Sequence, residues 1–316
     1  MTRAVWPTRL AGLAACICTS LAVAPSDHYD PGLFKNPDYV IIGGGPAGFV
    51  LAEELSANPD VTVVLLEGGP NTDGVENVDV PGYGVLLEGT QYSWNFSSQP
   101  DPNIQGNAPT VAQGRGFGGG SAINYLGACR GAPSVFEEWA DLSGDDGLRW
   151  PSFFKDFKAT TRFTHVDLNY QTHINESAYG KGPIELTAPD DNLGFVLKLI
   201  KAWKSVLKLP WLDLNDGHGL GIATSTDVIR ASNRTRVYAL QAYGWPMDGR
   251  PNAQQVFNAQ ATKINFTNKK ATSVTYVNPL TGESSSIKAK EVIVSAGALN
   301  TPKVSRISAK HALRQR

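Results

Sequence analysis

Three glycines of this chain stand at the spacing G-x-G-x-x-G: Gly43, Gly45 and Gly48. In such a motif the first glycine permits a tight turn, the second lets backbone approach a pyrophosphate, and the third lets a helix pack closely on a strand. A helix that begins at Pro46 and Ala47 presents free N–H groups and the positive end of its dipole to phosphate oxygens. The spacing therefore predicts a site for a phosphate-bearing ligand.

The elements around these glycines are a strand, a helix and a second strand. We expect a strand over residues 39–42, a helix ending near residue 57, and a strand over residues 61–66. Glu67 follows, about 20 residues after the last glycine, where a carboxylate can accept the hydroxyls of an adenosine ribose and disfavours a 2′-phosphate. This βαβ unit predicts a dinucleotide site but leaves open which dinucleotide it binds.

A second glycine-rich segment covers residues 114–124, and most positions from 114 to 120 are glycine. Core packing does not explain such a run, because each glycine costs backbone entropy on folding. We interpret it as backbone that passes very close to a bulky ligand, with Ser121 and Asn124 adding hydrogen-bonding groups. Arg115 has two interpretations, a partner for a phosphate or an ordinary surface arginine.

The last third of the chain predicts strands joined by tight turns. A β-meander is expected from short strand-like segments at 256–258, 262–266, 273–277 and 286–288. An apolar strand at 291–294 then ends in small residues at 295–298. We expect this strand to bring a third backbone segment to the ligand.

The middle of the chain is less patterned. Helices are expected at 134–142, 150–162 and 192–207. Residues 70–109 are rich in Gly, Pro, Asn and Asp and predict a long loop, with an aromatic cluster at 92–96. We favour the interpretation that this cluster anchors the loop in the core over direct contact with a ligand.

Composition limits the class of protein. The 316 residues suffice for one large domain or two ordinary ones. A hydrophobic content of 41% with 18% charged residues excludes a disordered chain. The formal net charge of −1 gives no indication of a nucleic-acid partner or of an anionic membrane surface.

The N-terminus has the pattern of a secretory signal peptide, with two arginines before a short, alanine-rich apolar run. We expect a signal over residues 1–22, cleaved after Ala22; a buried N-terminal helix is the alternative. Cys129 is then the sole cysteine of the mature chain, so no internal disulfide is expected. Candidate glycosylation sequons lie at Asn95, Asn175, Asn233 and Asn265. At Asn95 the flanking aromatic residues suggest burial that would block modification.

Three blocks of the sequence resemble the glucose-methanol-choline (GMC) family of FAD-dependent oxidoreductases. They are VIIGGGPAGFVLAEEL at 40–55, GRGFGGGSAINYLGACRG at 114–131 and KEVIVSAGALNTPKV at 290–304. The resemblance covers residues 37–304, and secreted fungal aryl-alcohol and glucose oxidases are its nearest members. It implies an α/β fold (α+β overall): a Rossmann-type FAD-binding domain with a parallel sheet and a β-meander, plus part of a second, substrate-binding domain.

The resemblance also implies a division of the chain. It assigns 37–150 to the first part of the FAD-binding domain, 151–249 to a partial substrate-binding domain and 250–304 to the second part of the FAD-binding domain. Residues 305–316 depart from the family pattern, because they are basic and lack its apolar run and its Ser-Gly-Ile-Gly. We expect an aberrant tail there.

Cofactor roles follow from the matching positions. The resemblance implies that Gly43, Gly45 and Gly48, with Pro46 and Ala47, hold the FAD pyrophosphate and that Glu67 binds the adenosine ribose. The flavin and its ribityl-phosphate chain would be lined by Gly118, Gly119, Gly120, Ser121 and Asn124, and Arg115 is a further candidate for cofactor binding. Tyr125, Leu126 and Gly127 would lie beside the ring, and Ala261 would offer backbone to the adenine. No metal is implied.

The family's chemistry is oxidation of the CH–OH group of an alcohol or sugar, with hydride transfer to flavin N5 and reoxidation by dioxygen or a quinone. Its catalytic histidine, and a second histidine or an asparagine, come from a C-terminal region that this sequence lacks. The five histidines present match no such motif. We therefore expect an inactive chain. The alternatives are a non-catalytic or misfolded FAD-binding fragment of a truncated gene product, and an NAD-dependent Rossmann dehydrogenase.

Overall fold

The computed structural model describes residues 32–166, 173–189 and 195–314. The predicted signal peptide at 1–22 lies outside the described residues, as does His28. The side chains of residues 310–314 are also outside the description, and His311 is among them.

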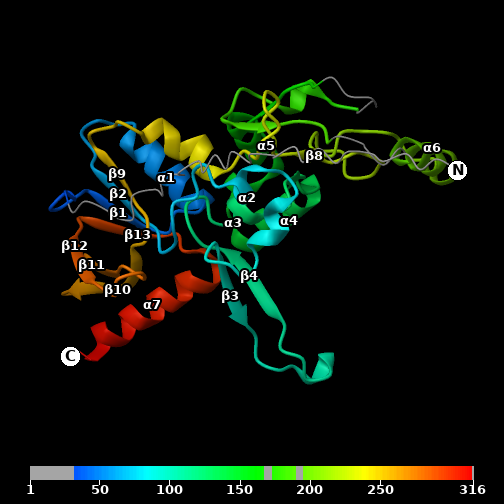
Figure 1. Ribbon diagram of the computed structural model, residues 1–316. Helices are drawn as coiled ribbons and strands as arrows, with labels where there is room; N and C mark the ends of the chain where they lie inside the picture. Colours follow the sequence, from blue (N-terminus) through cyan, green and yellow to red (C-terminus); the bar gives the residue numbers. More distant parts are fainter. Residues whose placement is uncertain (1–31, 167–172, 190–194, 315–316) are drawn as a thin grey trace, which may run out of the picture. The chain divides into compact units, whose positions relative to one another are not determined.

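A parallel sheet carries the glycine motif. Its strands lie in the order β13-β1-β2-β9 (Figure 1), and their bounds are β1 Tyr39–Ile42, β2 Val63–Leu66, β9 Ala253–Val256 and β13 Glu291–Val294. The inner strands read YVII and VVLL, continuous apolar runs of the kind that parallel sheets bury on both faces. The predicted parallel sheet is confirmed, although β2 begins at Val63 rather than at residue 61.

Helix α1, Pro46–Ser56, connects β1 to β2. Proline stands at its N-terminus, where the missing N–H costs no hydrogen bond. Its buried face includes Phe49 and Ala52, which pack toward the sheet. Gly48 allows this close approach, because a Cβ there would lie 1.9 Å from the backbone oxygen of Gly43.

The predicted β-meander is present as an antiparallel sheet in the order β10-β11-β12. Its bounds are β10 Gln260–Thr267, β11 Lys270–Val277 and β12 Ser284–Lys288. The expected first meander strand at 256–258 is wrong. Val256 instead ends β9 and pairs with Leu66 of the parallel sheet, and Asn258, with φ of 51°, turns the chain toward β10.

Helix α7, Gly297–Arg314, continues through the residues expected to form an aberrant tail. Val304 and Ser308 are buried. The Ser308 hydroxyl donates to the Val304 carbonyl at 2.7 Å and accepts from the Ile264 N–H of β10 at 2.9 Å. Figure 1 shows α7 in red beside the meander. Residues 305–309 are therefore packed helix, not a departure from the fold.

The stretch predicted as one long loop, 70–109, contains regular elements. They are α2 Glu76–Asp79, η1 Tyr83–Leu87, β3 Ser93–Ser97 and η2 Pro102–Ile104. Strand β3 pairs antiparallel with β4, Thr110–Gly114, so the aromatic cluster at 92–96 lies largely on a strand. Its side chains alternate between the two faces, which a loop would not impose.

The second glycine-rich segment leads into a region of helices and short strands. It comprises α3 Gly120–Ile123, β5 Gly127–Ala128, α4 Pro133–Ser143, η3 Asp146–Leu148, α5 Trp150–Thr160, β6 Thr161–Phe163, η4 Glu176–Ala178, β7 Ile184–Leu186, α6 Val196–Leu207, β8 Thr226–Asp227, η5 Leu240–Gly244 and η6 Trp245–Met247. The three predicted helices correspond to α4, α5 and α6; residues 192–194 of the third expectation lie outside the described chain.

A buried arginine ties this region together. Arg130 donates to the backbone oxygens of Ala178 and Asn215 at 2.6 and 2.8 Å, and to the Thr161 hydroxyl at 2.9 Å. Its guanidinium also lies over the rings of Phe157 and others. Arg130, the second arginine of the 114–131 block, is therefore a structural cross-link, and desolvation by burial lowers its pKa.

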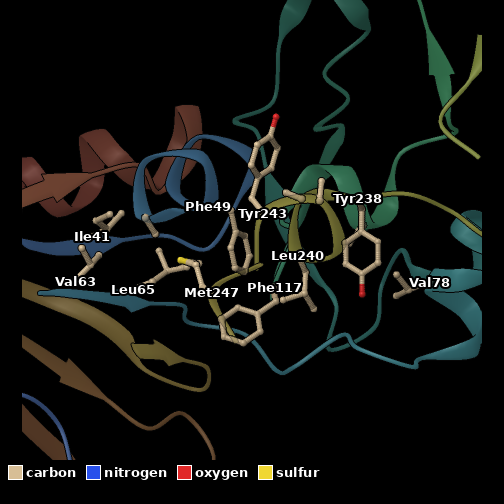
Figure 2. Close-up of a cluster of buried hydrophobic side chains, with 14 of the residues drawn as sticks. Ile41, Phe49, Val63, Leu65, Val78, Phe117, Tyr238, Leu240, Tyr243 and Met247 are labelled. Carbon is tan, nitrogen blue, oxygen red and sulfur yellow. The ribbon is translucent and has the colours of Figure 1, made fainter. Parts of the chain in front are cut away.

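The main core joins the βαβ unit to the second glycine-rich segment. Figure 2 shows Phe117 near Phe49 and Met247 in this cluster, and the ring centroids of Phe117 and Phe49 are 5.4 Å apart. Phe117 therefore anchors the glycine-rich segment under the sheet. In the described part of the chain we find no helix with the length and apolarity needed to cross a membrane.

Candidate dinucleotide-binding site

A cavity of about 540 Å³ opens at the carboxyl ends of β1, β2 and β13. Ligands of open parallel sheets bind at this edge. Segments far apart in the sequence line it: Ile42, Gly43, Gly45, Pro46, Ala47, Leu66, Glu67, Gly68, Trp94, Gln113, Gly114, Gly119, Gly120, Gln260, Ala261, Thr262, Ser295, Ala296, Gly297, Asn300, Lys303, Val304 and Ile307.

The N-terminus of α1 faces this cavity. Phe49 N–H donates to Gly45 O at 3.0 Å, so the helix ladder starts there and the N–H groups of Ala47 and Gly48 precede it. Gly45 has φ −86° and ψ −173°, and a Cβ on it would meet no protein atom within 4 Å. This end of the cavity is a backbone cradle with positive partial charge, suited to phosphate.

The second glycine-rich segment completes that cradle. Gly118 N–H donates to Gly44 O at 2.7 Å, and a Cβ on Gly119 would lie 2.9 Å from the Gly45 Cα. The two glycine segments, distant in sequence, are thus in backbone contact. Gly119 and Gly120, which the family resemblance assigns to the cofactor, line the cavity.

Glu67 is buried at the end of β2 and holds the surrounding loops. Its carboxylate accepts from the N–H groups of Gly44 and Gly69 at 2.8 Å and of Gly116 at 3.0 Å. Burial raises the pKa of Glu67, and these hydrogen bonds and the charge of Arg115 oppose that rise. A carboxylate offers about four acceptor positions, so one remains for a ligand hydroxyl.

Opposite Glu67 the cavity is lined by Gln260, Ala261 and Thr262 of β10. The sequence predicts Ala261 at this place. Gly68 is in close contact with Gln260 and Trp94, because a Cβ on Gly68 would be 3.3 Å from both Gln260 Cβ and Trp94 Cζ2. Trp94 also lines the cavity, so it stands where a ligand could contact it.

Helix α7 supplies a wall that the sequence reasoning missed. Ser295, Ala296 and Gly297 belong to the predicted third backbone segment, but the helix adds Asn300, Lys303, Val304 and Ile307. These residues follow the i, i+3, i+4, i+7 spacing of one helix face. That periodicity could have revealed them had the helix been expected beyond residue 304.

Arg115 does not line the cavity. Its guanidinium donates to the backbone oxygens of Gln91 and Gly68 at 3.1 Å each, and its Cζ lies 4.9 Å from the ring centroid of Trp94. Gly48 and Gly118 likewise lie behind the cavity wall, where a Cβ would meet Gly43 O and the Tyr238 ring.

The residues expected beside the flavin ring are also not among those that line this cavity. Asn124 Oδ1 accepts from Arg236 Nη1 at 2.6 Å and from the Leu126 N–H at 3.2 Å. Tyr125 is 66% exposed and donates to Glu88, which raises its pKa. Gly127 of β5 pairs with Asp227 of β8.

Ser121 serves the loop itself. Its hydroxyl donates to Gly118 O at 2.6 Å and accepts from the Ala239 N–H at 3.1 Å. Beneath it lies Arg236, 1% exposed, which the sequence reasoning did not single out and which donates to Ser121 O and Val78 O. Desolvation lowers the pKa of Arg236 to about 10.

The described histidines do not reach the cavity. His165 contacts Glu176 and His218 contacts Asp216, at 2.9 and 2.8 Å, both in exposed positions. Neither of these, nor His173, is among the residues that line the cavity.

A parallel sheet with this glycine cradle and a buried acid at the end of β2 defines a protein of the dinucleotide-binding class. The sequence profile of the family described as GMC oxidoreductase matches residues 37–312. The chain belongs to the GMC oxidoreductase family, whose cofactor is FAD.

Individual relatives agree with this assignment. Pyranose dehydrogenase 3 of Leucoagaricus meleagris is 30% identical over 277 residues, which are 84% of this chain and 45% of that protein. An FAD-dependent oxidoreductase from Chaetomium thermophilum is similar with a TM-score of 0.79 at 28% identity, covering 86% of this chain and 47% of that one. Pyridoxine 4-oxidase from Mesorbium loti gives a TM-score of 0.75 at 28% identity, with coverages of 84% and 50%.

The chain spans about half the length of the relatives it matches. The match reaches residue 312, so it includes most of the segment expected to be aberrant. The residues present fit FAD in one direct respect. Gly45 leaves open the space that a Cβ would fill, at the positive end of α1, where the diphosphate of a dinucleotide is stabilised.

Proposed function

We propose that this chain is the FAD-binding portion of an oxidoreductase that acts on the CH–OH group of an alcohol or sugar. The observation that carries the proposal is the backbone cradle formed by Gly45 and Gly119 at the N-terminus of α1. FAD, when bound, supplies the acceptor for a hydride from the substrate carbon. Dioxygen or a quinone is the electron acceptor that fits such a reaction.

Residues of the cavity divide the cofactor between them in this proposal. Gly43, Gly45 and the N–H group of Ala47 hold the diphosphate, and Gly48 lets α1 pack closely behind them. Glu67 accepts a ribose hydroxyl with its remaining acceptor position. The backbone of β10 at Ala261 meets the adenine. Gly119 and Gly120 lie against the ribityl chain, and residues 124–127 extend the site toward the ring.

The substrate side is proposed to lie beyond this cavity. Residues 151–249 form a substrate-binding portion, between the cofactor-binding portions at 37–150 and 250–304. The described histidines do not line the cavity, so we assign the acid–base step of alcohol oxidation to groups outside the described residues. On this proposal the chain alone binds FAD and oxidises alcohols slowly or not at all.

Secretion is part of the proposal, with residues 1–22 as its signal. Exposed Asn95 and Asn233 are then the favoured glycosylation sites. Burial at Asn95, expected from its aromatic neighbours, is not found. Asn175 and Asn265 are less favoured glycosylation sites, because their side-chain amides already donate hydrogen bonds. Asn175 donates to Asp216, and Asn265 donates to Ser273 and Thr275.

The test is a titration of the purified chain with FAD, monitored by calorimetry and by flavin fluorescence. NAD⁺ is titrated in parallel as the rival dinucleotide. Gly45→Ala places a methyl group in the cradle without touching protein and should weaken FAD binding at least tenfold while the fold is kept. Gly32→Ala is the matched control, since a Cβ there also meets no atom within 4 Å. Failure of the wild-type chain to bind FAD, or a preference for NAD⁺, would refute the proposed function.

A further inference from the structure

Trp94 is an aromatic wall at one end of the cavity. It stands on β3, is half-buried, and pairs with Gln113, which also lines the cavity. A Cβ built on Gly68 would lie 3.3 Å from Trp94 Cζ2 and 3.3 Å from Gln260 Cβ. Trp94 is thus near the part of the cavity that Gln260 and Ala261 line.

Arg115 holds this tryptophan in place. Its guanidinium lies over the indole, with Cζ 4.9 Å from the ring centroid, while Nη1 and Nη2 donate to Gln91 O and Gly68 O. Two fixed carbonyl partners set the plane of the guanidinium, and a guanidinium over an aromatic face is attractive. The carbonyl of Gly68 links this clamp to the residue beside Glu67.

We propose that Trp94 binds the adenosine moiety of the dinucleotide, and that Arg115 is a positioning residue that acts through the Trp94 ring and not through a phosphate. The inference rests on the proposed function, because it takes the ligand to carry an adenosine diphosphate. Packing of a base against an aromatic side chain commonly changes affinity by about tenfold or more on removal of the ring.

Arg115 has one feature that favours the opposite role. Its Nε is buried without a hydrogen-bond partner among the described residues, which leaves a donor for a ligand oxygen. A phosphate contact keeps most of its strength when lysine replaces arginine, since lysine keeps the charge. A clamp built on a planar group and two carbonyls does not survive that change. The two roles therefore predict different behaviour for the same variants.

The first measurement uses ADP, which carries adenosine and diphosphate without the flavin. Trp94→Leu should weaken ADP and FAD binding about tenfold by calorimetry. Trp139→Leu is the control, because Trp139 is 48% exposed on α4 and does not line the cavity. Thermal melts without ligand check that both variants fold. Should Trp94→Leu unfold, Trp94→Phe is used, and the change of tryptophan fluorescence on adding ADP should disappear.

The second measurement is a double-mutant cycle with Arg115→Lys. We expect this variant to weaken ADP binding three- to tenfold, and to have no further effect when combined with Trp94→Leu. Arg162→Lys is the control, because Arg162 also donates to two backbone carbonyls, of Gly182 and Pro183, away from the cavity.

Each outcome decides the inference. An Arg115→Lys variant that binds ADP as tightly as the wild type would place Arg115 on the phosphate, and additive losses in the double variant would show that Arg115 does not act through Trp94; either result would overturn its role as a clamp. Unchanged ADP binding in a folded Trp94 variant would overturn the role of the tryptophan while leaving the FAD proposal intact. A wild-type chain that binds neither FAD nor ADP would instead overturn the proposed function itself.

Discussion

Glu67 combines two tasks at the scale of a single residue. Its carboxylate accepts three backbone N–H groups from separate turns, and it also faces the cavity. Gln at this position keeps the size but presents an amide N–H₂ where acceptors are needed. At least one backbone N–H then lies buried without a partner.

We therefore expect Glu67→Gln to lower the free energy of unfolding by about 1–3 kcal/mol. Because burial raises the folded-state pKa of Glu67, the stability it contributes is largest below its unfolded pKa and declines as pH rises through the folded value. The difference in the free energy of unfolding between the wild type and Glu67→Gln should therefore become smaller as pH increases. Urea unfolding between about pH 4 and about pH 8 measures this. Glu138→Gln, at an exposed position on α4, is the control substitution.

Sequence reasoning located the backbone of the site better than its side chains. Glycine positions such as Gly45 and Gly119 follow from spacing, because backbone clearance is a local property. The partners of Arg115 and Trp94 depend on where Gly68 and Gln91 come to lie in the fold. No local pattern states that, so the sequence left Arg115 between a phosphate partner and a surface arginine and did not predict its contacts with Gly68 and Gln91.

At the scale of elements, α7 shows how a polar helix is held. The Ser308 hydroxyl accepts the Ile264 N–H of β10, which would otherwise be a buried donor without a partner. Ser308→Ala should cost about 1–2 kcal/mol by chemical denaturation. Ser305→Ala, exposed on the same helix, should change stability by less than about 0.5 kcal/mol. Equal effects of the two would show that this hydrogen bond does not hold the helix.

Asp38 joins three strands of the parallel sheet at their amino ends. It accepts from Lys290 Nζ at 2.6 Å and from the backbone and hydroxyl of Thr62 at 2.8 and 2.7 Å. These hydrogen bonds and the charge of Lys290 hold the pKa of Asp38 well below its ordinary value. The stability that Asp38 contributes is thus present above about pH 4 and is lost as pH falls.

Asp38→Asn should accordingly destabilise the chain by about 1–2 kcal/mol at neutral pH. The difference from wild type should shrink in acid, as the wild-type carboxyl becomes protonated. Guanidinium unfolding at several pH values tests this, with Asp60→Asn, at an exposed position, as the control substitution. A constant difference at every pH would show that charge is not the cause.

Which elements exist was easier to predict than which neighbours they take. Residues 256–258 and 262–266 both have strand character, and adjacent strands usually pair, so residues 256–258 were expected in the meander. The structure pairs Val256 with Leu66 in the parallel sheet instead. Similarly, strand β3 was not predicted, because the stretch 70–109 around it is rich in Gly, Pro and Asn. Antiparallel pairing with β4 makes residues 93–97 a strand.

At the scale of the whole molecule, FAD should act as a stabilising ligand. A ligand at 100 times its dissociation constant adds about 2.7 kcal/mol to the free energy of unfolding. We expect FAD at that excess to raise the Tm of the chain by several degrees in differential scanning fluorimetry. Gly45→Ala should lose this shift. A Tm that does not respond to FAD in the wild-type chain would contradict the proposal.

The strand order β13-β1-β2-β9 has a consequence for synthesis on the ribosome. Strand β1 begins at Tyr39, yet its neighbour β13 is made some 250 residues later, as the separation of 252 between Asp38 and Lys290 shows. At about 5–20 residues per second, that interval lasts tens of seconds. Throughout it, an apolar strand edge waits without its partner, and the nucleotide pocket lacks its α7 wall. One edge of β1 is therefore unpaired until β13 has been made, and the cavity gains its last lining residue only when translation has passed Ile307.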